Sequence, residues 1–167
     1  MDSSLITDVI GASEDKKVFG KIRLQKIFYL LDQLGLDSGF TYSYHHYGPY
    51  SEDLSNTLFF AEFFDKVIVE SQGKTKLGNI YSVFSLSENA NEMSPEVGKL
   101  SSDDIKTLVN TLEAPTSVVI ELAATIHWLR EKEGVAEWEA ELKARKTGKA
   151  TDENIKKSVD LLGSIGL

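Results

Sequence analysis

The fold is decided by residues 51–90, which read SEDLSNTLFFAEFFDKVIVESQGKTKLGNIYSVFSLSENA. The stretch opens on Ser51, a residue type that favours the N-cap of a helix. An apolar stripe follows at helical spacing, made of Leu54, Leu58 and Ala61. This spacing predicts a helix from Ser51 to Phe64.

Two strands and a turn are predicted immediately after this helix. Residues 67–69 and 81–86 are strand-like, and the polar, glycine-bearing stretch 72–79 between them is typical of a hairpin tip. A helix followed by a hairpin is the order expected of a winged helix. We therefore expect a mainly helical α+β fold with a winged-helix-like core, helices plus a small hairpin sheet, and a C-terminal helical extension.

Helical periodicity continues on both sides of this stretch. Residues 22–34 are apolar over more than half of a helical circumference, so we expect them to form the central helix. Ser101 and Asp104 have the spacing of a capping box at the start of a later helix. Further helices are predicted at 118–130, 135–146 and 151–162. We expect a single domain over 1–167, with the core in 1–92 and the helical extension of 93–167 packed on it.

Composition narrows the class of protein. The 167 residues include 26 Asp and Glu against 18 Lys and Arg, which gives a net charge of −8. A DNA-binding domain usually has the opposite sign of charge. The chain has no cysteine, no leader-like N-terminus and no apolar run near the ~18 residues of a membrane span. We expect a cytoplasmic protein with no membrane partner.

Candidate chemical groups are sparse. His45 and His46 are adjacent on an extended segment, so their side chains should point to opposite faces, and His127 has no second histidine at ligand spacing. Ser51 is explained by helix capping and lacks the surroundings of a nucleophilic serine. We therefore expect no enzyme activity, no catalytic residue, no metal and no cofactor.

One basic cluster precedes the central helix, and it consists of Lys16, Lys17, Lys21, Arg23 and Lys26. It is either a patch that faces phosphates or an acidic partner, or a solvated helix start. Together with Lys74 and Lys76 of the hairpin it defines an alternative function, a winged-helix transcriptional regulator that binds DNA through the wing and this patch. The acidic helix 51–64, which has neither Lys nor Arg, disfavours the usual docking in the major groove.

Four phenylalanines crowd the same helix: Phe59, Phe60, Phe63 and Phe64. They widen its apolar arc well beyond one stripe. Such a helix is either deeply buried or offers an aromatic surface to a partner. Because aromatic side chains dominate protein cores, we expect burial.

Two segments resemble a known family. Residues 23–30, Arg-Leu-Gln-Lys-Ile-Phe-Tyr-Leu, resemble the opening helix of Panacea-domain proteins, the SocA-like antitoxins. Residues 44–54, which contain Gly48-Pro49, resemble that family's next signature, and the chain resembles the uncharacterised YwgA-type proteins even more. Arg23 stands where the family usually has lysine, and the aromatic segment 40–47 is unusual.

The resemblance implies a protein-binding antitoxin or adaptor, often encoded beside a toxin or a phage-defence gene. The family has no established catalytic residues to carry over. We therefore expect a non-enzymatic protein-binding module that masks or recruits a partner protein, a toxin or a defence component. The residues expected to bind the partner are Tyr47, Pro49, Tyr50, Glu52 and Asp53.

Overall fold

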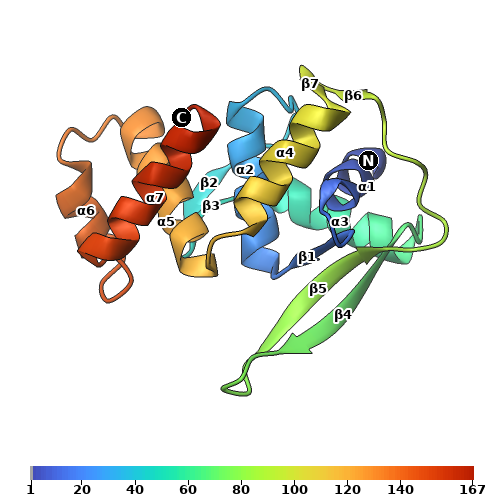
Figure 1. The fold of residues 1–167 in the computed structure, drawn as a ribbon, viewed down its shortest axis with the longest axis horizontal. Coiled ribbons are helices and arrows are strands. Elements are labelled where there is room, and N and C mark those ends of the chain that lie inside the picture. Colours follow the sequence, from blue (N-terminus) through green and yellow to red (C-terminus); the bar gives the residue numbers. More distant parts are fainter. Residues whose placement is uncertain (1) are drawn as a thin grey trace.

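The computed structural model describes residues 2–167 and is mainly helical α+β, as predicted (Figure 1). Its α-helices are α1 (Ser4–Ala12), α2 (Lys21–Gln33), α3 (Glu52–Phe63), α4 (Ser102–Glu113), α5 (Ser117–His127), α6 (Trp138–Arg145) and α7 (Asp152–Ile165), and a π-helical turn, η1 (Trp128–Lys132), extends α5. The strands are β1 (Lys17–Phe19), β2 (Ser43–His45), β3 (Gly48–Tyr50), β4 (Ile68–Lys74), β5 (Ile80–Leu86), β6 (Glu96–Val97) and β7 (Leu100–Ser101).

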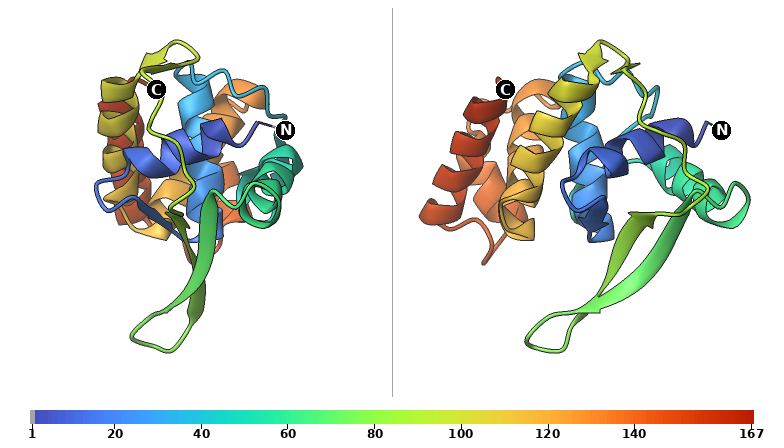
Figure 2. Two further views of the ribbon diagram at one scale, coloured as in Figure 1. Left: turned by 90° about the vertical axis from the view of Figure 1, so that its right-hand side faces the viewer. Right: turned by 45° about the vertical axis from the view of Figure 1, so that its right-hand side comes forward.

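The largest sheet is antiparallel with the strand order β1-β5-β4. Val18 of β1 lies opposite Phe84 of β5, and both side chains are buried. The outer part of the β4–β5 hairpin projects away from the helices (Figure 2). The predicted helix and hairpin are confirmed as α3 and β4–β5. The assignment of these elements to a winged helix stays a prediction.

Helix α2 lies at the centre of the molecule because its apolar residues face all directions. Every side chain from Leu24 to Leu31 is buried. Helix α5 packs against α2 on one side and against α7 on the other, while α4 packs against both α1 and α2. Polar side chains of α2 must therefore find their hydrogen-bond partners inside the protein.

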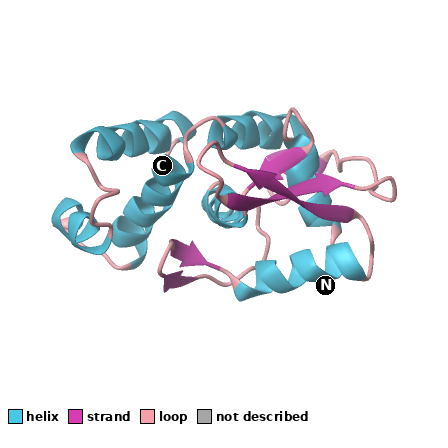
Figure 3. Cartoon of the chain, turned by 90° about the horizontal axis from the view of Figure 1, so that it is seen from below, coloured by secondary structure: helices cyan, strands magenta, loops and turns pink. Residues whose placement is uncertain are grey.

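The hydrophobic core continues across residue 92, the predicted boundary of the core region. One cluster of buried side chains joins Ile6 and Leu24 to Val109, Ile120 and Leu162. Helices α5 to α7 lie at the opposite end of the molecule from the β4–β5 hairpin (Figure 3). The predicted capping box is present, since Ser101 Oγ accepts from the N–H of Asp104 and the Asp104 carboxylate accepts from the N–H of Ser101.

The segment that carries His45 and His46, which was expected to be extended, turns back on itself. Residues 43–45 form β2, the chain turns at 46–47, and residues 48–50 return as β3. His45 pairs with Gly48 across this short hairpin. The turn is possible because Gly48 adopts a φ of +89°, which an L side chain rarely does. The Gly-Pro pair thus belongs to a second strand.

Candidate functional site

The start of α3 is fixed by side chains from two elements. Ser51 is fully buried, and its Oγ accepts a hydrogen bond of 3.2 Å from the N–H of Leu54. Gln25 of α2 holds the Ser51 backbone at both ends. Its amide nitrogen donates to the Ser51 carbonyl at 2.9 Å, and its carbonyl oxygen accepts from the Ser51 N–H at 2.8 Å. The direction of α3 is therefore set by the central helix.

Helix α3 has a buried stripe and an exposed aromatic side. The stripe of Leu54, Leu58 and Ala61 is buried, as predicted, and the helix contacts α1 and β4. The expected burial of the phenylalanines is wrong. Their exposed fractions are 50% for Phe59, 39% for Phe60, 57% for Phe63 and 65% for Phe64. At 3.6 residues per turn, one side of this helix cannot hold both sets of residues.

The four phenylalanine rings form one surface, which we call the aromatic face. Phe59 and Phe63 have ring centroids 4.6 Å apart, and the rings of Phe60 and Phe64 stack at 4.9 Å. Phe59 and Phe60 meet edge to face at 6.3 Å. The rings therefore cover one another in part, and a large fraction of each side chain stays exposed. Contiguous exposed apolar surface of this kind marks interaction sites.

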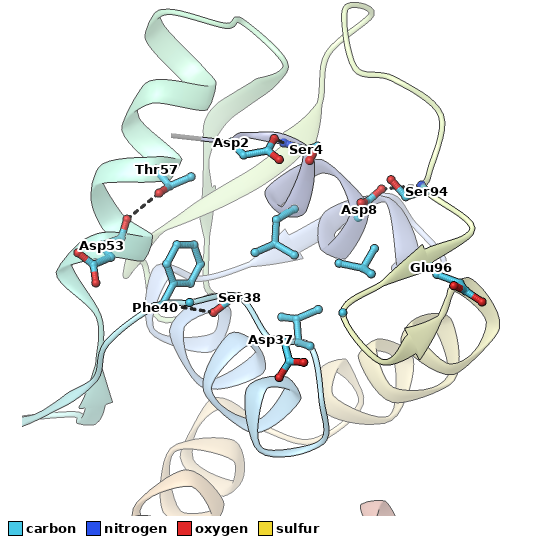
Figure 4. Close-up of a pocket in the computed structure, with 15 residues that line it drawn as sticks. Asp2, Ser4, Asp8, Asp37, Ser38, Phe40, Asp53, Thr57, Ser94 and Glu96 are labelled. Atoms are coloured by element: carbon cyan, nitrogen blue, oxygen red, sulfur yellow. Dashed lines mark hydrogen bonds between the residues drawn. The ribbon is translucent and has the colours of Figure 1, made fainter.

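An acidic cavity of about 570 Å³ lies beside α3 (Figure 4). We call it the acidic pocket, and the carboxylates that line it are those of Asp2, Asp8, Asp37, Asp53 and Glu96. They come from the N-terminus, α1, the loop after α2, α3 and β6. No Lys, Arg or His is among the lining residues that the structure describes.

Several of these carboxylates are held by hydrogen bonds that favour the charged form. The side-chain hydroxyl and the backbone N–H of Thr41 donate to Asp53 and hold the pKa of that carboxyl below its usual value. Hydrogen bonds from Ser4 lower the pKa of Asp2 in the same way. Asp8 accepts a 2.8 Å bond from the N–H of Ser94. The pocket is therefore negative at neutral pH.

The residues expected to bind a partner lie in two places. Tyr47, which is 43% exposed, and the half-buried Tyr50 flank the β2–β3 turn, while Pro49 between them is buried. Glu52 and Asp53 begin α3, with Glu52 exposed and Asp53 at the edge of the acidic pocket. Two of the expected residues therefore lie at the start of α3, and the other three lie in β3 or in the turn before it.

The residues that carry the family resemblance in α2 point inward. Arg23 Nη1 donates to the carbonyl of Pro115 at 2.8 Å, and Lys26 Nζ donates to the carbonyl of Pro49 at 2.6 Å. The hydroxyl of Tyr29 is 2.8 Å from Nδ1 of His127. Together with Gln25, these side chains connect α2 to the segments packed around it. These hydrogen bonds fix α2 relative to those segments.

The inward orientation of α2 side chains removes two residues from the predicted set of nucleic-acid contacts. Lys26 is 1% exposed and Arg23 is tied to backbone carbonyls at the end of α4, so neither side chain extends from the protein surface toward the backbone of a nucleic acid. The exposed lysines of that prediction are Lys16, Lys17, Lys21, Lys74 and Lys76.

A buried ionic cluster, which the sequence pattern did not indicate, supports the β2–β3 turn. Glu121 of α5 pairs with Lys146 at 2.9 Å and with Lys149 at 3.0 Å. Lys146 also donates to the carbonyl of His46 at 2.6 Å. Glu121 and Lys146 are 3% and 4% exposed, so this is an internal pair. No spacing in the sequence joins these residues, because they lie on different elements.

Glu113 is a partly buried carboxyl group at the end of α4. Its Oε1 is buried and has no hydrogen-bond partner among residues 2–167. Burial raises the pKa of Glu113 to about 7 from its ordinary 4.5, against the opposing effect of nearby Arg23. Between these two values the folded state keeps a proton that the unfolded state releases. The stability of the protein should therefore fall as pH rises through this window and remain lower above it.

We expect Glu113→Gln to remove that decline. The neutral amide has the same shape, so the variant should match the wild type near pH 4 and exceed its stability near pH 8, by about 1–2 kcal/mol. Urea unfolding at both pH values measures the difference. Glu88→Gln, which changes an exposed glutamate in the loop after β5, is the matched control and should leave the pH profile unchanged. A Glu113→Gln profile parallel to that of the wild type would contradict the expectation.

Residues 2–167 hold no ready metal site. No three histidine, aspartate or glutamate side chains converge there as the ligands of a metal ion would. None of the helices in that range has the length and apolar character needed to cross a membrane.

The fold and the site define a mainly helical α+β domain with an exposed aromatic helix beside an acidic cavity. The chain is similar to the uncharacterised protein YwgA of Bacillus subtilis (strain 168), with 27% identity over 114 residues. The aligned region covers 68% of this chain and 67% of that protein. No protein-family model matches the chain.

Proposed function

We propose that this chain is a non-enzymatic protein-binding module, antitoxin-like or an adaptor, that masks or recruits a partner protein through the aromatic face of α3. The observation that carries the proposal is the exposure of four adjoining phenylalanines on one helix. Keeping such a surface in water is unfavourable, at about 25 cal/mol for each Å² of apolar area. Covering it on binding would recover that free energy.

The surface next to the aromatic face supports a partner segment that is basic at one end and apolar at the other. Asp53, Thr57, Phe60 and Phe64 follow one another at steps of four, three and four residues, so they share one side of α3. That side runs from the acidic pocket to the phenylalanines. A matching partner segment would carry Lys or Arg at one end and apolar side chains at the other. The net charge of −8 would also speed its encounter with a basic partner.

A second copy of this chain fits the surface less well. Symmetric pairing through α3 would bring like surfaces together, because a two-fold interface uses the same patch on both subunits. Each copy would also bring a net charge of −8 to the complex, and like charges repel. The resemblance of residues 23–30 and 44–54 to the SocA-like antitoxins also supports a different protein as the partner.

We expect the double variant Phe63→Ser/Phe64→Ser to lose partner binding. Each phenylalanine is more than half exposed, so the fold should tolerate the change, while the loss of two aromatic anchors should weaken the Kd by about 100-fold or more. The candidate partner is the product of the adjacent gene, tested by co-purification, by binding in solution and by relief of its toxicity in growing cells. The control is Leu77→Ser, since Leu77 is 91% exposed at the tip of the hairpin, and it should bind normally.

Three results would overturn the proposal. The first is that the wild-type chain neither binds the product of the adjacent gene nor relieves its toxicity. The second is that the double variant binds that product as well as Leu77→Ser does. The third is that analytical ultracentrifugation shows a wild-type dimer that only the double variant dissociates, which would assign the aromatic face to self-association.

DNA binding through the hairpin is the second candidate. The observation in its favour is that β4–β5 projects clear of the helices and carries the exposed Lys74 and Lys76 (Figure 2). Against it, α3 presents Glu52, Asp53 and the phenylalanines where a reading helix would need cations. A mobility shift at low salt that is lost when Lys74 and Lys76 are both changed to Glu would favour this candidate.

A further inference from the structure

A second cavity lies between the start of α2 and the turn of the β2–β3 hairpin, and its volume is about 330 Å³. We call it the lysine–tyrosine pocket. The side chains on which the argument depends are Lys21, Lys26, His45, His46, Tyr47 and Tyr50. None of the described residues that line it is Asp or Glu, although the chain has a net charge of −8. The sign of this pocket is therefore opposite to that of the whole molecule.

Lys26 is the innermost cation of the pocket. An ammonium group has three donors, and the structure gives Lys26 one acceptor, the carbonyl of Pro49 at 2.6 Å. Within residues 2–167 no carboxylate forms an ion pair with it. The nearby Glu121 is already shared by Lys146 and Lys149. Burial lowers the pKa of Lys26 to about 7, as expected for a buried amine without a paired anion.

The rim of the pocket combines cations with aromatic rings. Lys21 is exposed at the first turn of α2. The ring of Tyr50 lies 4.7 Å from that of His45, and the ring of Tyr47 lies 4.8 Å from that of His46. The ammonium of Lys149, which pairs with Glu121 and does not line the pocket, is 5.0 Å from the centre of the Tyr47 ring. A ligand there would meet positive charge and flat apolar walls together.

We propose that the lysine–tyrosine pocket binds a small organic phosphate of nucleoside monophosphate size, with its phosphoryl group on Lys21 and Lys26 and its planar ring against Tyr47 and Tyr50. A phosphate monoester has a charge of about −1.5 to −2 at neutral pH, and its approach would favour the charged form of Lys26 beside the ammonium of Lys21. The cavity is at the small end of the roughly 300–1,000 Å³ that ligand sites occupy. This site is separate from the aromatic face, so its failure would leave the proposed function intact.

Calorimetric titration of the full chain with adenosine monophosphate tests the proposal. We expect saturable binding with one site per chain, weaker binding of inorganic phosphate, and at least about tenfold weaker binding of adenosine, which lacks the charged group. Lys21→Glu should weaken the binding of adenosine monophosphate by about tenfold or more, since it places a like charge beside the phosphoryl group. Lys74→Glu makes the same charge change on the exposed hairpin and should stay within about twofold of the wild type.

Lys26→Met is the companion variant and should abolish binding where circular dichroism shows that it folds. Because Lys21 is exposed, Lys21→Glu keeps the test decisive even where Lys26→Met does not fold. The absence of saturable binding at millimolar adenosine monophosphate would overturn the proposal. Equal weakening by Lys21→Glu and Lys74→Glu would do the same, since the general field of the protein would then explain it. If a single-stranded oligonucleotide bound more tightly than adenosine monophosphate, and Lys21→Glu weakened that binding, the pocket would be assigned to nucleic acid. That result would overturn the proposal of a small ligand.

Discussion

Glu121→Gln is expected to lower the free energy of unfolding by about 3–5 kcal/mol, because it leaves buried lysine charge without its counter-ion. Lys146 is 4% exposed and makes its 2.9 Å ion pair with this carboxylate. Lys149, the other partner, has a side chain that is 38% exposed and can turn to solvent. The cost therefore comes mainly from Lys146. Urea unfolding of the variant and the wild type measures it.

The control is Glu153→Gln, which also breaks an ion pair of glutamate with lysine. Glu153 pairs with Lys157 at 2.7 Å, but the two side chains are 76% and 57% exposed. Water screens such a pair, so its loss should cost about 0.5 kcal/mol or less. The double variant Glu121→Gln/Lys146→Met removes both charges of the buried pair and should recover part of the loss. A cost for Glu121→Gln no larger than that of Glu153→Gln would contradict this account.

The buried ionic cluster of Glu121 connects the stability of the protein to the lysine–tyrosine pocket and to the aromatic face. Lys146 donates to the carbonyl of His46, and Lys26 donates to the carbonyl of Pro49, so two buried lysines hold the β2–β3 turn from within. Tyr47, which lies between these carbonyls in the chain, lines the lysine–tyrosine pocket. Ser51, at the end of the same segment, caps α3. Disturbing the cluster should therefore displace the turn and the start of α3 together.

The parts of the fold that local chemistry determines could be predicted from the sequence. The Ser51 cap and the stripe of Leu54, Leu58 and Ala61 specify α3, and the glycine-bearing tip specifies the hairpin. Helix α2 could be predicted to be central because its apolar residues surround it. In each case the signal lies within a few turns of chain.

The exposure of the phenylalanines could be predicted from the position of the apolar stripe on α3. A helix that buries Leu54, Leu58 and Ala61 turns positions 59, 60, 63 and 64 away from the core by its period alone. The expectation of burial came from residue type, which says that phenylalanine prefers the core on average. Here position decides against residue type, and such a conflict is typical of functional surfaces.

The buried polar side chains could not have been found from spacing. Lys26, Glu121 and Lys146 come from segments far apart in the sequence, and each looks like an ordinary surface residue among its sequence neighbours. Only the packing of α5 and the segment after α6 around the β2–β3 turn brings them together. For the same reason the exposed basic cluster is smaller than its sequence predicts, since Arg23 and Lys26 point into the protein.

Gly48→Ala is expected to lower the free energy of unfolding by about 2–5 kcal/mol. Two effects add. Gly48 has a φ of +89°, a conformation that strains an L residue, and a Cβ there would lie 2.6 Å from Oγ1 of Thr125. Thr125 is fully buried on α5 and donates to the carbonyl of Glu121 at 2.8 Å, so it has little room to move.

A matched variant separates strain from collision. Gly39 has a φ of +76°, but a Cβ at that position would meet nothing within 4 Å, so Gly39→Ala should cost only the backbone strain, about 1–2 kcal/mol. Adding Thr125→Ala to each glycine variant should recover stability beside Gly48→Ala and none beside Gly39→Ala. Equal losses for the two glycine variants would show that the close approach of the β2–β3 hairpin to α5 does not constrain this position. A larger loss for Gly48→Ala would show that close packing against α5 constrains β3, the strand that leads into the cap of α3.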